Sequence, residues 1–552
     1  MSISNDLNFL FQKALNYHNS GDLKNAESIY RSLIKSIPNN FEVNLYLAIL
    51  LSQKKDFNEA LKIYSKILKI NPKSHIAYLN QGLVFQELDR LNDAFNSYEK
   101  SNSLLPNVQA SCSQGIILSK LNKDKDALAY FEKAIKIDRN YPNLYYNYAK
   151  ALANAGSINE AVTYYLKSIE HSQNLIDSFY NLGCIYQDLK QFESALHYYQ
   201  KVITIDTKHY ASFNNIGQIN HILRNIPEAL KYFDKALEIN PNYHLAKWNK
   251  ALSLILSGKF IEGWELYENR WYLSNFQDKR HQKIDLLKSI KNITGKKILV
   301  WWEQGFGDVI QFSRYLLELQ KLNAEITFEV QKPLKSLFES MNKKIKVVDF
   351  INSKSGEFDY QIPIMSLPML FKTDVKNIPN HIPYLFSEIN KKEIWKKNLN
   401  SKITKKIGIA WSGAKQNKKL KFRSIPLKIF SEIFNSQYEY HSLQKEYFQN
   451  DEELFSKLKN FYTHENKLHD FSDTAALIDN MDIVITIDTS VAHLAGSIGK
   501  KVWIIIPYMD DYRWFMDINF SPWYPTAKIF RQKKINEWDE VINEIKKELM
   551  KI

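Results

Sequence analysis

Three kinds of feature are missing from this sequence, and each absence excludes a class of protein. Only two cysteines, Cys112 and Cys184, occur in 552 residues, too few for a disulfide framework, so a reducing compartment is favoured. No apolar run approaches the ~18 residues of a membrane-spanning helix. Residues 1–6 lack the charged start and apolar core of a secretory signal. We therefore expect a cytoplasmic protein with no transmembrane segment.

Several catalytic and binding motifs are missing as well. The sequence has no Cys/His cluster with metal-ligand spacing, no Gly-x-Ser-x-Gly elbow, no P-loop and no kinase motif set. The pair Asp510-Asp511 is by itself a weak magnesium signal, so we expect no metal and no cofactor. The net charge is +14, but the lysines are spread along the whole chain without a basic stripe that alternates with aromatics. We therefore expect no nucleic-acid partner.

The first half of the chain is repetitive. Small residues recur about every 34 residues, each followed four positions later by an aromatic and preceded about twelve positions earlier by a second small residue. The first set of small residues is Ala26, Ala60, Ala94, Ala127, Ala161, Ala195, Ala229 and Gly263. The aromatics are Tyr30, Tyr64, Tyr98, Phe131, Tyr165, Tyr199, Phe233 and Tyr267. The second small residues are Ala14, Ala48, Gly82, Gly115, Ala149, Gly183, Gly217 and Ala251.

This pattern resembles that of the tetratricopeptide (TPR) family. Small residues let two antiparallel helices approach closely, the aromatic fills the space beside them, and a proline ends the second helix, as at Pro38, Pro72, Pro106 and Pro241. One helix pair cannot bury its own apolar face, so the pairs stack. The resemblance predicts an all-α superhelix of about eight repeats over residues 7–272.

Asparagine occupies one repeat position in the first helices of five repeats. The resemblance places this position on the concave groove of the superhelix, where amides can bind the backbone of an extended peptide. A similar ladder serves that purpose in O-GlcNAc transferases, which also join TPRs to a glycosyltransferase. The alternative is that asparagine is simply common at this TPR position. The candidate peptide-binding residues are Asn80, Asn147, Asn181, Asn215 and Asn249.

Beyond residue 272 the periodicity changes to alternating strand and helix patterns, which predict parallel sheets. We expect a multidomain α + α/β protein with a connector at 273–296, polar over Asn275 to Lys283, and two Rossmann-like lobes at 297–395 and 396–552, divided by the polar stretch Asn390 to Lys405. The predicted strands are 297–302, 325–330, 345–349, 406–411, 438–444, 482–488 and 502–507. The predicted helices are 308–322, 426–434, 473–479 and 538–550.

The first of these strands leads into a turn with two glycines, Gly305 and Gly307, followed by Asp308. Glycines here let backbone amides approach a ligand, although the third glycine of a dinucleotide fingerprint is replaced by Ile310. The Gly-Asp-Val-Ile run resembles the first-strand motif of heptosyltransferases (glycosyltransferase family nine), which have the two-lobed GT-B fold. The resemblance implies that Asp308 is the general base, and the first lobe the acceptor side. The alternative is a helix cap, a common role of aspartate.

The second lobe begins with a strand, a loop and a basic cluster that match the same family. The family places a basic residue three positions before a proline on the donor phosphate, and Arg423 holds that position before Pro426, where lysine is usual. Arginine can bind phosphate oxygens through two parallel hydrogen bonds. Neighbouring Lys418, Lys419 and Lys421 are not assigned individually. Gln444, at the end of a later strand, matches a position that contacts the nucleotide.

The most specific motif is the turn Asp488-Thr489-Ser490 followed by His493-Leu494-Ala495. An apolar strand delivers this turn to a helix start, whose free N–H groups and dipole favour a diphosphate. Heptosyltransferases carry Asp-Ser/Thr-Gly-x-x-His-Leu-Ala here, so Ser490 replaces a glycine and puts the details of donor contact in doubt. His493 either touches the phosphate or sugar, or is a packed histidine.

These resemblances imply an inverting, metal-independent GT-B glycosyltransferase. The donor, a substrate and not a cofactor, is a nucleotide-sugar held by Gly305, Gly307, Arg423, Gln444, Asp488, Thr489, Ser490 and His493. The heptosyltransferase likeness suggests an ADP-sugar, and the TPR fusion suggests UDP-GlcNAc by analogy. The repeats would recruit the acceptor: a lipopolysaccharide-type acceptor fits the ADP-sugar and a polypeptide fits UDP-GlcNAc, and we expect a protein. The alternative is a non-catalytic TPR scaffold with a degenerate nucleotide-binding domain.

Overall fold

The computed structural model of the chain describes residues 5–172, 174–274, 280–351, 356–399, 405–413, 423–508, 511–535 and 537–552. Its internal contacts divide the chain into two compact units, Met1–Ser212 and Phe213–Ile552. The division falls inside the predicted repeat array. The last repeats therefore belong to the same compact unit as the α/β half.

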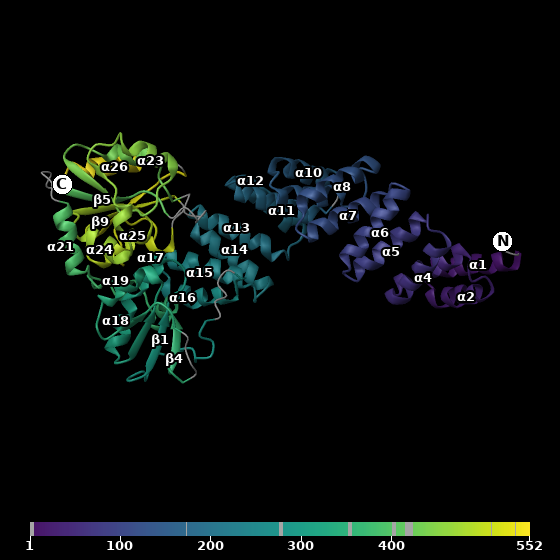
Figure 1. Cartoon of the computed structure of the whole chain (residues 1–552), viewed down its shortest axis with the longest axis horizontal. Helices are drawn as coiled ribbons and strands as arrows, with labels where there is room; N and C mark the ends of the chain where they lie inside the picture. Colours follow the sequence, from purple (N-terminus) through teal and green to yellow (C-terminus); the bar gives the residue numbers. More distant parts are fainter. Residues whose placement is uncertain are drawn as a thin grey trace. The chain divides into compact units, whose positions relative to one another are not determined.

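The first unit is built of helices that pack in antiparallel pairs, and each pair contacts the next (Figure 1). Prolines 38, 72 and 106 lie two residues after the ends of α2, α4 and α6, as predicted. The helices are α1 (Asn5–Asn19), α2 (Leu23–Ser36), α3 (Phe41–Gln53), α4 (Phe57–Ile70), α5 (His75–Glu87), α6 (Leu91–Leu104), α7 (Val108–Lys120), α8 (Asp124–Ile137), α9 (Leu144–Ala155), α10 (Ile158–Glu170), α11 (Leu175–Asp188) and α12 (Phe192–Ile205).

The repeat signature has a direct structural cause. A Cβ added to Gly183 would lie 2.5 Å from the Tyr199 ring, and one added to Gly82 would lie 2.7 Å from the Tyr98 ring. The second small residue is therefore glycine because the aromatic of the partner helix lies against its backbone. The turn inside each helix pair contains one residue in the left-handed backbone region, which lets the chain reverse within two or three residues. These residues are Gly21, Lys55, Asp89, Asn122, Gly156, Lys190, Arg224 and Gly258.

The second unit begins with the last helix pairs of the array, and α13 starts just before the boundary. With them the described residues form sixteen repeat helices, which confirms the predicted all-helical TPR superhelix of about eight repeats. The 3-10 helix η1 follows at the predicted end of the array. These elements are α13 (Tyr210–Ile222), α14 (Ile226–Ile239), α15 (His244–Leu256), α16 (Phe260–Tyr267) and η1 (Glu268–Tyr272).

Two all-parallel sheets follow. The first has the order β3-β2-β1-β4 and the second the order β10-β9-β8-β5-β6-β7. The strands of the first are β1 (Lys297–Trp301), β2 (Glu325–Glu329), β3 (Lys346–Val348) and β4 (Tyr360–Pro363). Those of the second are β5 (Lys405–Ala410), β6 (Tyr438–Ser442), β7 (Phe461–Tyr462), β8 (Ile483–Ile487), β9 (Val502–Ile506) and β10 (Ala527–Arg531).

The strand order of the second sheet decides where a ligand can bind. Counted from β5 as the first strand, it is the 3-2-1-4-5-6 order of doubly wound α/β folds. The order reverses between β5 and β8, where Ala410 pairs in register with Thr486. The loops after these two strands therefore lie side by side, and this is the crevice in which such folds bind ligands. In the first sheet the corresponding reversal lies between β1 and β4.

Helices and 3-10 turns connect the strands (Figure 1). In the first sheet they are α17 (Phe306–Phe312), α18 (Arg314–Lys321), η3 (Lys332–Leu334), α19 (Lys335–Glu339), η4 (Ile364–Ser366), α20 (Leu367–Leu370) and η5 (Val375–Asn377). In the second part they are α21 (Ile389–Asn398), α22 (Leu427–Phe430), η7 (Ser431–Ile433), α23 (Gln449–Phe455), η8 (Glu465–Lys467), α24 (Phe471–Asp479), α25 (Ser490–Ser497), η9 (Tyr512–Trp514) and α26 (Asp539–Leu549).

All seven predicted strands are present, whereas β4, β7 and β10 were not predicted. The predicted helix 308–322 is two helices that meet at Ser313. The stretch Asn390–Lys405 lies between the strands of the two sheets and begins with α21, which packs on α24, with Lys391 Nζ 2.8 Å from Asp473 Oδ1. Trp395 is buried in this contact, so the helix belongs to the core and does not act as a linker. Residues 400–404 lie outside the described part of the chain.

The end of the repeat array is joined to the first sheet by a buried ion pair. Arg270 in η1 donates to both carboxylate oxygens of Glu303 at 3.0 and 2.8 Å, and Glu303 also accepts the backbone N–H of Met365 at 3.1 Å. The predicted connector also packs on this sheet, because the backbone N–H of Leu287 donates to Gln361 at 2.9 Å. The described part of the connector is therefore an integral part of the fold, while residues 275–279 lie outside the described chain.

Candidate functional site

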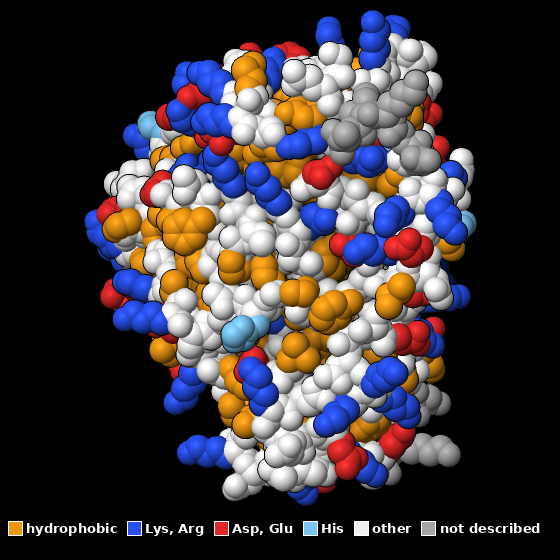
Figure 2. All heavy atoms as spheres, turned by 90° about the vertical axis from the view of Figure 1, so that its left-hand side faces the viewer, with side chains coloured by type: hydrophobic (Ala, Val, Ile, Leu, Met, Phe, Trp, Pro, Cys, Tyr) orange, Lys and Arg blue, Asp and Glu red, His pale blue; other side chains and the backbone are white. Residues whose placement is uncertain are grey.

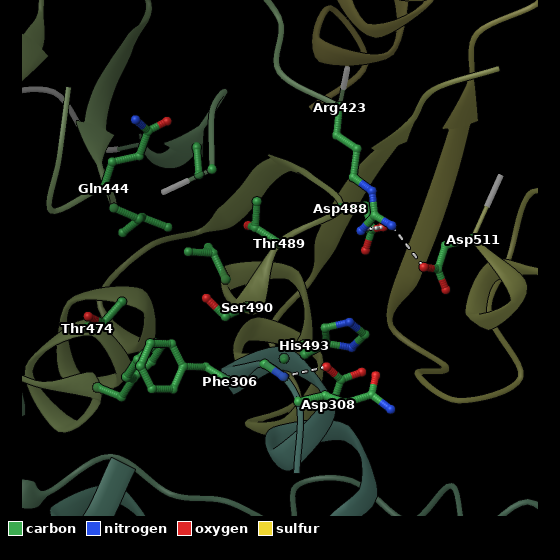
Figure 3. A pocket seen from close by; sticks show the side chains of 18 of the residues that line it. Phe306, Asp308, Arg423, Gln444, Thr474, Asp488, Thr489, Ser490, His493 and Asp511 are labelled. Carbon is green, nitrogen blue, oxygen red and sulfur yellow. Dashed lines mark hydrogen bonds and ion pairs between the residues drawn. The ribbon is translucent and has the colours of Figure 1, made fainter. Parts of the chain in front are cut away.

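A cavity of about 840 Å³ lies where the carboxyl ends of the two sheets face each other (Figure 3). Residues 304–308 after β1 line one side, and the turns after β5, β6, β8 and β9 line the other. Every predicted donor-side and catalytic residue lines this one cavity, although the residues come from both sheets: Gly305, Gly307, Asp308, Arg423, Gln444, Asp488, Thr489, Ser490 and His493. The structure therefore brings together the residues chosen from separate sequence motifs.

Asp308 is the third residue of α17 and has two partners. Its Oδ2 accepts the backbone N–H of Gly305 at 2.9 Å, which caps the helix start, and its Oδ1 accepts from the Arg513 guanidinium. The capping role that the sequence left open is thus present. The role of Asp308 as a base stays a prediction, and this carboxylate lies at the cavity wall, where a base would be needed.

The two glycines before Asp308 have different surroundings. A Cβ on Gly307 would lie 2.8 Å from Cδ2 of His493, because the first turns of α17 and α25 pack against each other. A Cβ on Gly305 would meet only Oδ2 of Asp308, at 3.2 Å. Gly307 is therefore required for the close approach of the two helix starts, and Gly305 is the glycine that leaves room beside its backbone.

An alternating chain of charges crosses the cavity. Arg423 donates to Asp488 at 2.7 Å and to Asp511 at 2.9 Å, as Figure 3 shows. The other oxygen of Asp511 accepts from Arg513 at 2.6 Å, and Arg513 continues the chain to Asp308. Three carboxylates and two guanidiniums from both sheets thus form one network, with a net charge of −1 (−3 from the carboxylates and +2 from the guanidiniums).

Burial and the two arginines shift the pKa values of the Asp488 and Asp511 carboxyl groups in opposite directions: burial raises these values and the guanidiniums lower them. Burial raises the pKa of the Asp488 carboxyl, and the Arg423 guanidinium opposes this effect only in part. Burial would also raise the pKa of Asp511, but the Arg513 and Arg423 guanidiniums outweigh it and hold that pKa well below its usual range. The carboxylate of Asp488 raises the pKa of Arg423, so both guanidiniums stay charged. Each of the two cations is therefore already paired with two carboxylates inside the cavity.

His493 is a packed histidine. Its ring stacks on Trp514 with the centroids 5.1 Å apart, and its Nδ1 lies 3.0 Å from the Tyr524 hydroxyl. Burial, reinforced by the nearby Arg513 charge, lowers the pKa of His493 well below its ordinary value. The ring is therefore neutral near pH 7, so it cannot attract a phosphate by charge, although it still lines the cavity.

The start of α25 lies at the cavity and is not capped by the side chain of its N-cap residue. Thr489 is the N-cap residue in extended conformation, and its side chain makes no capping hydrogen bond to the N–H groups of this helix start. Thr489 and Ser490 face the cavity between Gln444 and Asp308 (Figure 3). Such a helix start offers N–H donors and a favourable dipole to a phosphate.

Gln444 holds the turn after β5 in place. Its Oε1 accepts the backbone N–H groups of Trp411 and Ser412 at 2.6 and 2.9 Å, and its Nε2 donates to the Ser412 hydroxyl at 2.8 Å. The side chain is therefore engaged with protein atoms at the edge of the cavity, and its contact with a nucleotide stays a prediction. Lys418, Lys419, Lys421 and Asp510 lie outside the described residues.

Two charged residues of the site were not singled out by sequence reasoning. Arg513 was not considered, and Asp511 was seen only as part of a weak acidic pair. Both follow β9, and position at the carboxyl end of a parallel strand was the one available signal. The last repeat was also not expected at the site, yet Trp248 and Leu252 of α15 and Tyr267 of α16 line the cavity.

The repeat asparagines differ in their surroundings. Asn249 is buried and donates to Asn214 at 2.9 Å, and Asn80 is partly exposed and donates to the carbonyl of Ile76 in its own helix at 2.9 Å. Asn215 accepts from Asn214 at 3.1 Å. Asn147 and Asn181 are also partly exposed. The peptide-binding role of this ladder stays a prediction, and Asn249 contributes least to an open surface.

Tetratricopeptide-repeat family models match residues 18–81, 108–141, 130–163, 176–209 and 210–243. The first half of the chain is a TPR array. Protein FlbA of Caulobacter vibrioides is 22% identical over 321 residues, and the match covers 54% of this chain and 53% of FlbA. The chain thus matches about half the length of this relative.

Solved TPR structures are similar to parts of the chain. A TPR protein from Parabacteroides merdae is 19% identical over 45% of this chain and 98% of its own, with a TM-score of 0.34. The Cut9–Hcn1 structure is 17% identical over 44% of this chain and 48% of its own, with a TM-score of 0.35. YrrB, described as a TPR protein with an unusual peptide-binding site, is 23% identical over 39% of this chain and 95% of its own, with a TM-score of 0.26.

The described residues contain neither a membrane-spanning helix nor a metal-binding cluster. Within the described ranges no helix is long and apolar enough to cross a membrane. Over the same residues no three His, Cys, Asp or Glu side chains are grouped so that they could hold a metal ion. On the face drawn in Figure 2, Lys and Arg side chains are spread over the surface among apolar and neutral areas. This distribution agrees with the dispersed lysines of the sequence.

Proposed function

We propose that the chain is an inverting, metal-independent GT-B glycosyltransferase whose TPR array recruits the acceptor. The observation that carries this proposal is the single cavity at the carboxyl ends of two parallel sheets. An uncapped helix start and two guanidiniums on one sheet's side face a carboxylate, Asp308, on the other. These are the parts that transfer from a nucleotide-sugar requires: a site for the diphosphate and a proton acceptor opposite to it.

The proposed step is a single displacement at the anomeric carbon. The acceptor hydroxyl gives its proton to Asp308 while its oxygen attacks that carbon, and the bond between this carbon and the diphosphate oxygen breaks. The electron pair leaves with the diphosphate, whose charge the amides of Thr489 and Ser490 and the Arg423 guanidinium stabilise. Attack opposite to the leaving group inverts the anomeric configuration.

The acceptor is proposed to be a protein or peptide. TPR arrays are protein-interaction scaffolds, and the last repeats of this array belong to the compact unit that holds the cavity. Trp248, Leu252 and Tyr267 of the last repeat form part of the cavity wall. An acceptor segment bound to this last repeat would therefore lie beside the cavity that holds Asp308.

The first test is thermal stability of the full chain with UDP, GDP, ADP, CMP and their sugars. One nucleotide should raise the melting temperature selectively, because ligands that bind only the folded state stabilise it. Arg423→Gln should abolish most of this ligand-induced shift, whereas Lys533→Ala, at an exposed ion pair with Glu540, should leave it unchanged. The ligand-induced shift within each variant is compared, since Arg423→Gln also leaves Asp488 and Asp511 less well paired.

A second candidate function is a non-catalytic TPR scaffold with a degenerate nucleotide-binding domain. This function is supported by the fact that two side chains of the site already bind protein atoms. Arg423 donates to two carboxylates, and Gln444 accepts from backbone N–H groups. If no nucleotide or nucleotide-sugar shifts the melting temperature, this scaffold function replaces the transferase. If the shift is present and the released nucleotide accumulates with an acceptor extract, in wild type but not in Asp308→Asn, the transferase stands.

A further inference from the structure

Arg513 lies between the proposed base and the proposed diphosphate site. Its Nη1 donates to Asp511 at 2.6 Å, its Nη2 donates to Asp308, and its guanidinium stacks over the Tyr512 ring at 4.3 Å. The side chain is 11% exposed and lines the cavity. Its charge is close enough to act on His493 in α25 and on Asp488 after β8. One side chain therefore adjoins both halves of the site.

Both carboxylate oxygens of Asp308 accept a hydrogen bond from a protein donor in this structure. Oδ2 accepts the backbone N–H of Gly305, and Oδ1 accepts from the Arg513 guanidinium. A general base must come within hydrogen-bond distance of the proton that it removes. An acceptor hydroxyl would have to share Oδ1 with a guanidinium, so its approach to the base is hindered while Arg513 stays in place.

The backbone that carries Arg513 is fixed from the repeat side. The Tyr512 ring packs on Trp264 and Tyr267 of α16, both with centroids 6.0 Å apart, and Phe515 stacks on Phe260 at 5.3 Å. On the same side, Arg224 in the turn before α14 donates to the carbonyl of Tyr508 at 3.0 Å. Tyr512 and Phe515, on either side of Arg513, are packed in this way, so the long Arg513 side chain with its several rotamers is the part proposed to move.

We propose that Arg513 couples donor binding to release of the base. When the donor diphosphate binds, the Arg513 side chain moves from Asp308 to the diphosphate oxygens, which carry more charge than one carboxylate. Oδ1 of Asp308 is then free to take the acceptor proton, and Arg513 stabilises the departing diphosphate. The inference rests on the proposed function and adds a positioning residue and an order of binding, with the donor before the acceptor.

A double-mutant cycle tests this coupling, with affinity for the nucleoside diphosphate selected by the nucleotide panel as the measured quantity. Asp308→Asn keeps the size of the side chain but removes the charge that competes for Arg513. We expect Asp308→Asn to bind the diphosphate several-fold more tightly than wild type and Arg513→Gln to bind it about tenfold more weakly. The gain from Asp308→Asn should vanish in the Arg513→Gln background, because contacting residues are not additive.

The corresponding nucleoside monophosphate is the control ligand, since it lacks the second phosphate that Arg513 would reach. Its affinity should change less than that of the diphosphate in every variant. Arg513→Lys should restore part of the diphosphate affinity, which separates loss of a cation from loss of folding. Equal or weaker diphosphate binding by Asp308→Asn in both backgrounds would overturn the coupling while leaving the transferase proposal intact. The failure of wild type to bind any nucleotide would instead remove the proposed function itself.

Discussion

At the residue scale, the strictest packing constraint of the cavity is Gly307. Alanine here would place a Cβ 2.8 Å from the His493 ring, which is itself held by Trp514 and Tyr524. Because the ring cannot easily yield, we expect Gly307→Ala to lower the free energy of unfolding by about 1–3 kcal/mol, the usual cost of overpacking. The ligand-induced thermal shift should fall with it, since the starts of α17 and α25 must separate.

Gly305→Ala is the matched control for this prediction. Its Cβ would meet only the Asp308 carboxylate at 3.2 Å, at an exposed turn. Thermal unfolding of both variants, followed by tryptophan fluorescence, should show a clearly larger loss for Gly307→Ala. Equal melting temperatures for the two variants would contradict the packing argument.

The same scale shows what the sequence could and could not predict about the site. Asp308, Thr489 and Ser490 were found because each stands in a motif with a fixed position after an apolar strand. The partners of these residues were not found: whether Arg423 meets a phosphate or two carboxylates depends on Asp511, which is 88 positions away in the chain. Arg513 stands in no motif, and its role depends on the spatial proximity of α17 to η9, which one sequence does not contain.

At the scale of elements, the glycines of the repeats test why one TPR position is so restricted. In α11 a Cβ on Gly183 would lie 2.5 Å from the Tyr199 ring. Helix propensity favours alanine over glycine by about 1 kcal/mol, whereas overpacking costs about 1–3 kcal/mol. We expect overpacking to dominate, so Gly183→Ala should destabilise the first unit. Asp188→Ala, at an exposed position of the same helix, should be neutral or slightly stabilising.

Circular dichroism at the helical band measures this effect, combined with hydrogen exchange of α11 and α12. Faster exchange in Gly183→Ala than in wild type is the expected result. Stabilisation of Gly183→Ala to the same degree as Asp188→Ala would mean that the ring gives way freely and that the repeat signature has another cause.

Elements with strong periodicity were predicted well, and weakly patterned ones were not. The repeat helices and the apolar strands β8 and β9 follow from residue spacing alone. The edge strands β7 and β10 and the short β4 have mixed or brief patterns, so they were missed. Helix α21 was not predicted, because four lysines surround its one buried aromatic, Trp395. Its burial comes from contact with α24, a tertiary effect that overrides composition.

At the scale of the whole molecule, the eleven tryptophans give a selective probe. All of them lie between Trp248 and Trp538, within the second compact unit. Tryptophan fluorescence therefore reports only on Phe213–Ile552, whereas far-ultraviolet circular dichroism reports on both units. The comparison of the two signals separates unfolding of the unit that holds the cavity from unfolding of the first repeats.

Three buried or half-buried histidines of the second unit make its stability sensitive to acid. Burial lowers the pKa of His221, His441 and His464 to about 4 from an ordinary value of 6.5. Between these pH values the unfolded chain binds more protons than the folded one, so stability is complete above about pH 6.5 and is lost progressively as the pH falls to about 4. Buried Glu303, Asp451 and Asp488 act in the opposite direction, because burial raises their pKa values.

His441→Asn isolates the histidine contribution from that of the carboxyl groups. His441 is 2% exposed, and its Nδ1 lies 3.1 Å from Nε2 of His464. Because burial lowers its pKa, acidification from pH 6.5 to 4 should lower the free energy of unfolding by on the order of 2 kcal/mol through this histidine. The fluorescence-detected melting temperature should therefore fall less steeply with acid in His441→Asn than in wild type. His197→Asn, exposed in the first unit, should leave that slope unchanged. Identical slopes for His441→Asn and wild type would show that the carboxyl groups, and not these histidines, set the response of the second unit to acid.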